Sequence, residues 1–292
     1  MAEPQILIVD VESDVRSEIT KVADQLSASG FNVVRPASSK ELTTKIGLSS
    51  LSLDDRPDLV VHFSLGDPTP WDGILESFEM VGVRVSNPFG AARRLISRVG
   101  MCSFLDSLRI SQPDWYYGSP NGIPAEFGDT VVEKSVDGHL VHVVDRRRIH
   151  AAAKVGFYQR LIENPSGDIK TVYWVFGRCF SMVKPDTMNI KAGALIEKRL
   201  TDNTDPRHEE IVRKIQRVSG LDFFCVDFIN GHVIDVNFCP NPFRHPQAVD
   251  WLVAGFTSII QEQSALRRSV TASNVIQQSV VGIPGQACFV NP

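Results

Sequence analysis

The first third of the chain alternates between short apolar runs and segments in which apolar residues recur every three or four positions. The short runs are typical of buried strands and fall at residues 5–9, 31–34, 58–63 and 83–85. The segments with helical spacing fall at residues 15–26, 39–47 and 71–78. This alternation predicts a small parallel sheet flanked by helices. No GxGxxG pattern follows the first run, so a dinucleotide site is not expected there.

After residue 88 the pattern predicts longer helices and paired strands, so the expected fold class is α/β followed by α+β. The expected helices are residues 91–108, 206–219 and 248–266. The expected strands are residues 130–135, 168–176, 179–184, 223–229 and 233–238, with a weaker strand at 194–200. Residues 267–292 have no clear periodicity, and two readings stay open for them, a mobile tail or a segment that packs on a neighbouring subunit.

One stretch in the last third carries the most specific signal. Asn230-Gly231 separates two apolar runs and favours a type I′ hairpin turn, because both central residues of that turn need a positive φ. A two-residue turn pairs residue 227 with residue 234 and places Asp227 beside Asp235. Asp235 and Asn237 lie two positions apart on one strand and share a face. Three oxygen donors would therefore converge, and such donors suit Mg²⁺.

Composition and charge narrow the classes of partner. The chain has 292 residues, of which 43% are hydrophobic and 22% charged, as in ordinary soluble globular proteins. A net charge of −4 argues against nucleic acid as a partner. No apolar run is long enough to span a bilayer, and the first residues lack an export signal, so we expect a cytoplasmic protein with no membrane association. Five widely spaced cysteines suggest reduced thiols.

The run from Asp227 to Asn237 resembles the last motif of the ATP-grasp superfamily, in which an acid on one strand is followed by acid-x-Asn on the next. The resemblance is to carboxylate–amine ligases such as glutathione synthetase and ribosomal-protein glutamate ligases, and more distantly to inositol phosphate kinases. It implies an ATP-grasp fold preceded by a small parallel α/β domain. The implied segments are an N-terminal domain (1–88), a helical connector (89–118), a small subdomain (119–163), a large subdomain with the metal hairpin (164–266) and a C-terminal tail (267–292).

The same resemblance assigns roles in binding ATP. Lys134, at the end of a strand, would contact the nucleotide phosphates, and Asp137-Gly138 would begin the loop that closes over them. Many relatives have several glycines in this loop, whereas this chain has one. The linker between the two subdomains would hold adenine through Gln159, Arg160, Leu161 and Ile162, of which Arg160 and Leu161 depart from the usual acid and aromatic residue.

Further roles concern catalysis and metal binding. Lys170 would reach the terminal phosphate and bind the nucleotide, and Lys184 would take the later basic position, so that two cations face one phosphoryl group. Arg199 would meet a substrate carboxylate or an acyl phosphate. The metal ligands would be Asp227, Asp235 and Asn237, holding Mg²⁺, with Mn²⁺ as an alternative. Asp235 stands where many relatives have Glu. Arg98 falls where relatives carry a basic residue, although an exposed arginine on an amphipathic helix fits the sequence equally well.

The function implied by the resemblance is an ATP-dependent ligase that joins a carboxylate to an amine through an acyl phosphate. Its substrates would be small molecules or peptides, and a homodimer is the oligomer that we consider. A kinase of the inositol phosphate kinase type is the first alternative, since the chain has Lys170 where ligases often have Arg. A nucleotide-binding module without turnover is the second alternative; loss of a metal ligand would favour it, and all three ligands are present.

Overall fold

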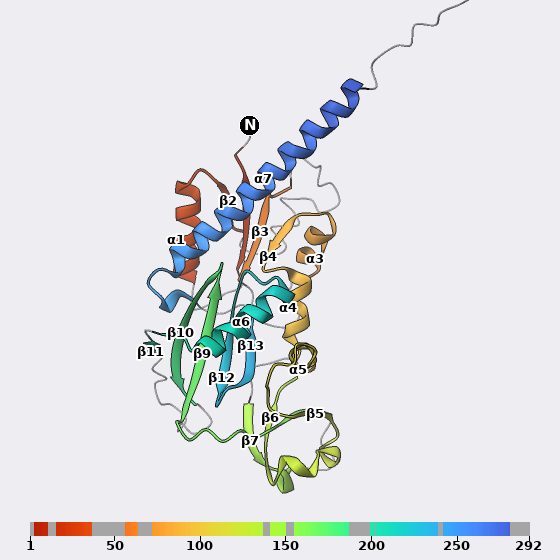
Figure 1. Ribbon diagram of the computed structural model, residues 1–292, viewed down its shortest axis with the longest axis vertical. Helices are drawn as coiled ribbons and strands as arrows, with labels where there is room; N and C mark the ends of the chain where they lie inside the picture. The colour runs from red at the N-terminus through yellow and green to blue at the C-terminus, as the bar shows by residue number, and fades with distance from the viewer. Residues whose placement is uncertain are drawn as a thin grey trace, which may run out of the picture.

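The computed structural model describes most of the chain. The described residues are 3–10, 16–36, 56–63, 72–136, 141–149, 155–186, 199–201, 203–238 and 242–280. The predicted helix at 39–47 lies outside them, as do Asp137 and Gly138. Three sheets follow one another along the long axis of the molecule (Figure 1). This mixed α/β and α+β architecture confirms the fold class expected from the sequence.

The N-terminal sheet is parallel, as predicted, and has the strand order β2-β1-β3-β4. Its strands are β1 (Gln5–Asp10), β2 (Asn32–Val34), β3 (Leu59–Phe63) and β4 (Arg84–Ser86). Helices α1 (Arg16–Ala28) and α3 (Asp72–Met80) connect the strands. All five residues of β3 are buried, which explains why this strand has no polar alternation, because helices cover both faces of such a sheet.

The central sheet has five antiparallel strands in the order β11-β10-β9-β12-β13. Its strands are β9 (Asp168–Val175), β10 (Arg178–Pro185), β11 (Arg199–Thr201), β12 (Phe223–Ile229) and β13 (His232–Asn237). Helix α6 (Pro206–Ser219) packs on β9 and ends at Gly220, which has a φ of 69°. This left-handed residue stops the helix and directs the chain into β12.

The third sheet is smaller and has the order β5-β8-β6-β7. Its strands are β5 (Trp115–Gly118), β6 (Thr130–Lys134), β7 (Val141–Asp145) and β8 (Gly156–Arg160). The connector predicted for residues 89–118 and the linker predicted around residues 156–163 thus each contribute a strand to this sheet. Short 3-10 turns occur at η2 (Pro120–Gly122), η3 (Ala125–Phe127), η4 (Arg146–Arg148) and η6 (Pro242–Arg244).

The connector contains two helices, α4 (Phe89–Ile96) and α5 (Arg98–Ser107), where the sequence predicted one helix over 91–108. Ser97 interrupts them with an extended backbone, and its side chain accepts a hydrogen bond of 3.0 Å from the Gly100 amide. Serine is a preferred N-cap because its hydroxyl satisfies one of the free amides of the first turn. The prediction of one continuous helix was wrong because serine is also tolerated within helices.

The last helix is longer than predicted. Helix α7 (Ala248–Val280) continues past residue 266 into the segment that the sequence left without structure, and packs on α1, β3 and β9. Its C-terminal half extends away from the three sheets (Figure 1). Within the described part of the chain, no helix combines the length and apolar character needed to cross a bilayer.

Asn87 fixes the N-terminal sheet to the central sheet. Its side-chain amide donates to the carbonyl oxygens of Phe223 and Phe238, both at 2.6 Å. Its side-chain oxygen accepts from the backbone amides of Asp222 and Phe223 at 2.6 and 2.9 Å. The Arg84 guanidinium adds an ion pair of 2.7 Å to Asp222. Because Asn87 is fully buried, these bonds form out of water and hold the two sheets in one orientation.

Candidate active site

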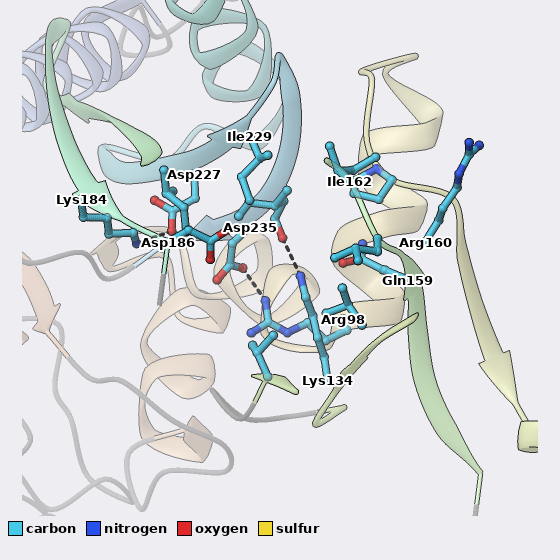
Figure 2. A pocket seen from close by; sticks show the side chains of 16 residues that line it. Arg98, Lys134, Gln159, Arg160, Ile162, Lys184, Asp186, Asp227, Ile229 and Asp235 are labelled. Atoms are coloured by element: carbon cyan, nitrogen blue, oxygen red, sulfur yellow. Dashed lines mark hydrogen bonds and ion pairs between the residues drawn. The ribbon is translucent and has the colours of Figure 1, made fainter. Parts of the chain in front are cut away.

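A cavity of about 290 Å³ lies between the small sheet and the central sheet. Figure 2 shows the acidic side chains and Lys184 on the side of the central sheet, opposite the strand that carries Gln159. The lining residues are Arg98, Pro113, Val132, Lys134, Val141, Gln159, Arg160, Leu161, Ile162, Ile169, Lys184, Asp186, Asp227, Ile229, Ile234 and Asp235. Eight of these were predicted as site residues from the sequence, namely Lys134, Gln159, Arg160, Leu161, Ile162, Lys184, Asp227 and Asp235.

The hairpin of β12 and β13 turns at Asn230 and Gly231 with φ angles of 46° and 81°, as the prediction of a type I′ turn requires. The predicted register is wrong by one residue. A bulge follows Asp227, so Asp227 pairs with Asp235 directly and not with Ile234. Such a bulge sets two residues of one strand against one of the other. It brings the two carboxylates directly opposite each other, and both side chains line the cavity.

Asp227 is held by β9 and β10. Its carboxylate accepts hydrogen bonds from the Thr171 hydroxyl and from the Lys184 ammonium, each at 2.6 Å. Burial opposes the positive charge of Lys184, but the adjacent Asp227 carboxylate outweighs it and raises the pKa of the ammonium. Lys184 therefore stays charged and cancels one of the two negative charges on the hairpin.

Asp235 is held by Arg98, the first residue of α5. The Arg98 guanidinium donates to the Asp235 carboxylate, and the Arg98 side chain is only 8% exposed (Figure 2). Burial alone would raise the pKa of Asp235, but the charges of Arg98 and Lys134 lower it. Of the two readings of Arg98 from the sequence, an exposed residue on an amphipathic helix is thus incorrect. Arg98 belongs to the cavity.

Lys134 projects from the end of β6 toward the hairpin. Its ammonium donates to the carbonyl oxygen of Ile234 at 2.9 Å (Figure 2). Ile234 is the residue that the bulge leaves out of the strand register, so its carbonyl is available for this contact. Burial lowers the pKa of Lys134 to about 8, against the opposing charge of Asp235. Lys134 is the cation of the cavity whose charge changes near neutral pH.

Apolar side chains share the lining of the cavity. They include Val132, Leu161 and Ile162 from the small sheet and the segment after it, and Ile169, which pairs with Lys184 across β9 and β10. Gln159 is 2% exposed, and its amide donates to the Cys102 thiol over 3.7 Å. The cavity thus combines apolar walls with a few charged side chains, as small-molecule sites commonly do.

Several predicted residues lie elsewhere. Lys170 pairs with Val183, one position from the pair of Lys184 and Ile169, so the two lysines project from opposite faces of the sheet. Lys170 lines a different pocket with Arg207 and His208, and the expectation that Lys170 and Lys184 face one point is wrong. Arg199 is exposed on the edge strand β11.

Asn237, the third predicted metal ligand, is half-buried on β13 opposite Cys225. It shares a strand face with Asp235 but is not among the residues that line the cavity. Asp137 and Gly138, predicted to begin the loop over the phosphates, fall outside the described residues.

Asp186 is a site residue that the sequence did not indicate. It is 3% exposed at the end of β10 and accepts a hydrogen bond of 2.9 Å from the Asn164 amide. A buried carboxylate two residues beyond Lys184 adds a third negative charge to the cavity. The only signal for it in the sequence is its position directly after the Lys184-Pro185 pair that ends a strand.

The donor set fits a hard divalent cation. Among the residues that the structure describes, no three His, Cys, Asp or Glu side chains are grouped to hold a metal ion. Asp227 and Asp235 supply two carboxylates on neighbouring strands, and Mg²⁺ commonly takes one or two carboxylates while phosphates and water complete its shell. Both acids are already in ion pairs, so a metal would compete with Lys184 and Arg98.

Comparison with known proteins gives matches in structure alone. Neither protein-family models nor curated proteins match the sequence. The ATP-grasp ligase PsnB, in complex with a minimal precursor, Mg and ADP, superposes with a TM-score of 0.66 at 16% identity, over 89% of this chain and 99% of PsnB. D-alanine–D-alanine ligase from Bacillus anthracis gives 0.62 at 14% identity, over 92% and 100%. A RimK domain ATP-grasp protein from Sphaerobacter thermophilus gives 0.61 at 18% identity, over 85% and 98%.

These neighbours agree with the resemblance carried by the hairpin, and each is covered almost completely. Structural matches at such low sequence identity establish the fold alone. The substrates of this protein have to be inferred from the site itself. The chain has the ATP-grasp fold.

Proposed function

We propose that this protein is a Mg²⁺-dependent ligase that uses ATP to join a carboxylate to an amine. One observation carries the proposal. Two lysines and two directly opposed carboxylates, Lys134, Lys184, Asp227 and Asp235, line the cavity between the two sheets. The structural neighbours support the class of reaction, since they are ATP-grasp ligases, and PsnB is described with Mg and ADP.

The cavity suits a nucleotide. The apolar side chains of Val132, Leu161 and Ile162 would pack against the adenine ring. The phosphates would then lie toward Lys134 and Lys184, whose ammonium groups supply positive charge from β6 and β10. Because both lysines project from strands, their positions are fixed before the ligand arrives, which lowers the entropic cost of binding.

Asp227 and Asp235 would hold the divalent cation, with Asn237 as the further ligand that the resemblance implies. When bound, the metal neutralises charge on the outer phosphates. The protein contributes a matched set of charges around it. Thr171 and Lys184 fix the orientation of Asp227, and Arg98 fixes that of Asp235. Lys170 and Arg199 play no part in this proposal, because they lie away from the cavity.

The proposed reaction has two steps. A carboxylate oxygen of the first substrate attacks the γ-phosphorus of ATP, the bond from that phosphorus to the bridging oxygen breaks, and ADP leaves. The product is an acyl phosphate, whose phosphate is a good leaving group. The amine nitrogen of the second substrate then attacks the carbonyl carbon, the bond to the phosphate oxygen breaks, and the nitrogen loses a proton. Lys134 and Lys184 stabilise the charge that moves in the first step.

The substrates would be a carboxylate on a small molecule or peptide and an amine. Among the neighbours, PsnB is described with a precursor peptide, and another ATP-grasp ligase, from Chryseobacterium gregarium, with a leader and core peptide. Peptides therefore belong in any screen, together with single amino acids. ATP-grasp sites choose their acceptor through loops and pocket walls, which vary more than the nucleotide site.

The decisive experiment traces the oxygen atoms of the carboxylate substrate into the products. Purified protein, Mg²⁺ and ATP are incubated with amino acids and peptides, and ADP release identifies active pairs. The active carboxylate is then labelled with ¹⁸O in both oxygens. A ligase transfers one labelled oxygen to inorganic phosphate and retains the other in the amide, as mass spectrometry would show. Unlabelled phosphate with an amide product would contradict an acyl phosphate, and phosphate attached to a hydroxyl would indicate the kinase alternative.

A further inference from the structure

Arg98 stands where three parts of the fold meet. The helix break at Ser97 makes Arg98 the first residue of α5 and aims its side chain at the central sheet. Its backbone amide donates to the carbonyl of Val136 over 3.0 Å, two residues beyond Lys134 in the small subdomain. Its guanidinium pairs with Asp235 on β13. One residue thus contacts the connector, the small subdomain and the metal hairpin.

Gly100 is required for the break between helices α4 and α5. A Cβ atom on Gly100 would collide with the Arg94 carbonyl oxygen and press on the Ser97 hydroxyl, so the turn between α4 and α5 requires glycine at this position. The Arg98 side chain is 8% exposed and that of Asp235 is 29% exposed. A cation this deeply buried is costly unless an opposite charge stays close.

We infer that Arg98 competes with the divalent cation for the Asp235 carboxylate and is released from it when metal and nucleotide bind together. This inference rests on the proposed function, since it concerns the metal of that reaction. Arg98 acts here as a positioning residue. While Arg98 holds Asp235, a metal ion alone gains that carboxylate only by breaking a buried ion pair. Nucleotide phosphates give the guanidinium a new anionic neighbour, so metal and nucleotide would bind cooperatively.

The test measures binding of Mn²⁺ without nucleotide, by the electron paramagnetic resonance signal of the free ion. Arg98→Met removes the competing charge and keeps an unbranched side chain. The matched control is Arg84→Met, which breaks an Arg–Asp pair of the same kind, to Asp222, outside the cavity. Both variants lose the cation of an Arg–Asp ion pair, so both are expected to unfold at a lower temperature than the parent protein. Only Arg98→Met should change the metal affinity.

We expect Arg98→Met to lower the Mn²⁺ dissociation constant by about tenfold, because one positive charge next to the binding site is gone. Adding Asp235→Asn to Arg98→Met should cancel the gain. An unchanged or weaker affinity for Mn²⁺ in Arg98→Met would overturn the inference. Failure of the proposed function is distinguishable, because the parent protein would then bind Mn²⁺ neither alone nor with ADP.

A second measurement uses the parent protein and does not depend on a variant that folds poorly. Nitrogen-labelled arginine gives side-chain NMR signals, and Arg98→Lys and Arg84→Lys assign two of them. The Arg98 signal should change its shift and exchange rate when Mg²⁺ and ADP are added together, and much less when Mg²⁺ is added alone. The Arg84 signal should stay in place. An Arg98 signal unaffected by the joint addition would also overturn the inference.

Discussion

Lys134 and Lys184 line the same cavity, yet their surroundings set opposite pKa shifts. Lys184 lies against Asp227, which raises the pKa of its ammonium despite burial. Lys134 has a carbonyl as its hydrogen-bond acceptor, and burial lowers its pKa to about 8. The sequence indicated both lysines as phosphate ligands but could not separate them, because the difference comes from the neighbour that each ammonium meets after folding.

This difference predicts a pH dependence of nucleotide affinity. Phosphate groups favour the charged form of Lys134, so binding requires a proton on an ammonium whose free pKa is about 8. Affinity for ADP, measured by calorimetry, should be constant below that pKa and fall on the order of tenfold between about pH 7.5 and pH 9.5. Lys134→Arg keeps its charge over this range and should give a flat profile. The same fall in Lys134→Arg would assign the effect to another group.

Among the elements, the β12–β13 hairpin illustrates what a sequence pattern determines. Asn230-Gly231 predicted the turn and its type, and the positive φ angles confirm it. The bulge after Asp227 has no signature in the sequence, and the pairing of β12 with β9 continues past it without a shift. It nevertheless decides the site, since it sets Asp227 opposite Asp235.

The turn gives a prediction on stability. Gly231 has a φ of 81° and open space around its Cα, so Gly231→Ala adds backbone strain without a collision. We expect a loss of about 1 kcal/mol in the free energy of unfolding, measured with urea. Gly73→Ala is the control, since Gly73 lies in α3 with equal space and no positive φ. That variant should match or exceed the parent protein in stability. Equal losses in both would show that the turn imposes no strain.

Helices and strands were predicted well where apolar residues recur regularly on the buried face or faces. They were predicted poorly where contacts between distant segments determine the structure. The parallel N-terminal sheet, β9 with β10, and α6 follow the predicted pattern. The prediction that Lys170 faces the site was wrong. It came from a sequence motif, whereas the pairing of Lys170 with Val183 places its side chain on the other face of the sheet. Asp186 entered the site through packing between distant segments, which no local pattern encodes, and the same packing decided between the two alternatives left open for Arg98.

At the scale of the whole molecule, the hydrogen bonds of Asn87 join the N-terminal sheet to the central sheet, and we call this contact the joint. His62 at the end of β3 donates from Nε2 to the Asn87 carbonyl at 2.9 Å, so Nδ1 of its neutral ring carries no proton. Nδ1 is buried and finds no hydrogen-bond partner among the described residues. Burial lowers the pKa of His62 to about 4, because a second proton would place an unpaired charge in the core.

The joint should therefore weaken in acid. Between its ordinary pKa of 6.5 and its folded pKa of about 4, His62 takes up a proton in the unfolded chain but not in the folded one. Stability is then fully present above about pH 6.5 and is lost as the pH falls, by up to about 3 kcal/mol at pH 4. Urea unfolding of the parent and of His62→Gln isolates this loss. If both lose stability equally between pH 7 and pH 4, His62 is not its source.

The central claim is that Asp227 and Asp235 hold a divalent cation against a nucleotide in the cavity. Calorimetric titration with ADP, with and without Mg²⁺, tests it most directly when the parent is compared with the double variant Asp227→Asn, Asp235→Asn. Both proteins should bind one ADP without Mg²⁺, through the two lysines and the apolar side chains of the cavity. Mg²⁺ should tighten binding by the parent by about a hundredfold and leave the double variant unchanged, since amides are poor ligands for Mg²⁺. An equal gain from Mg²⁺ in both proteins would contradict the account.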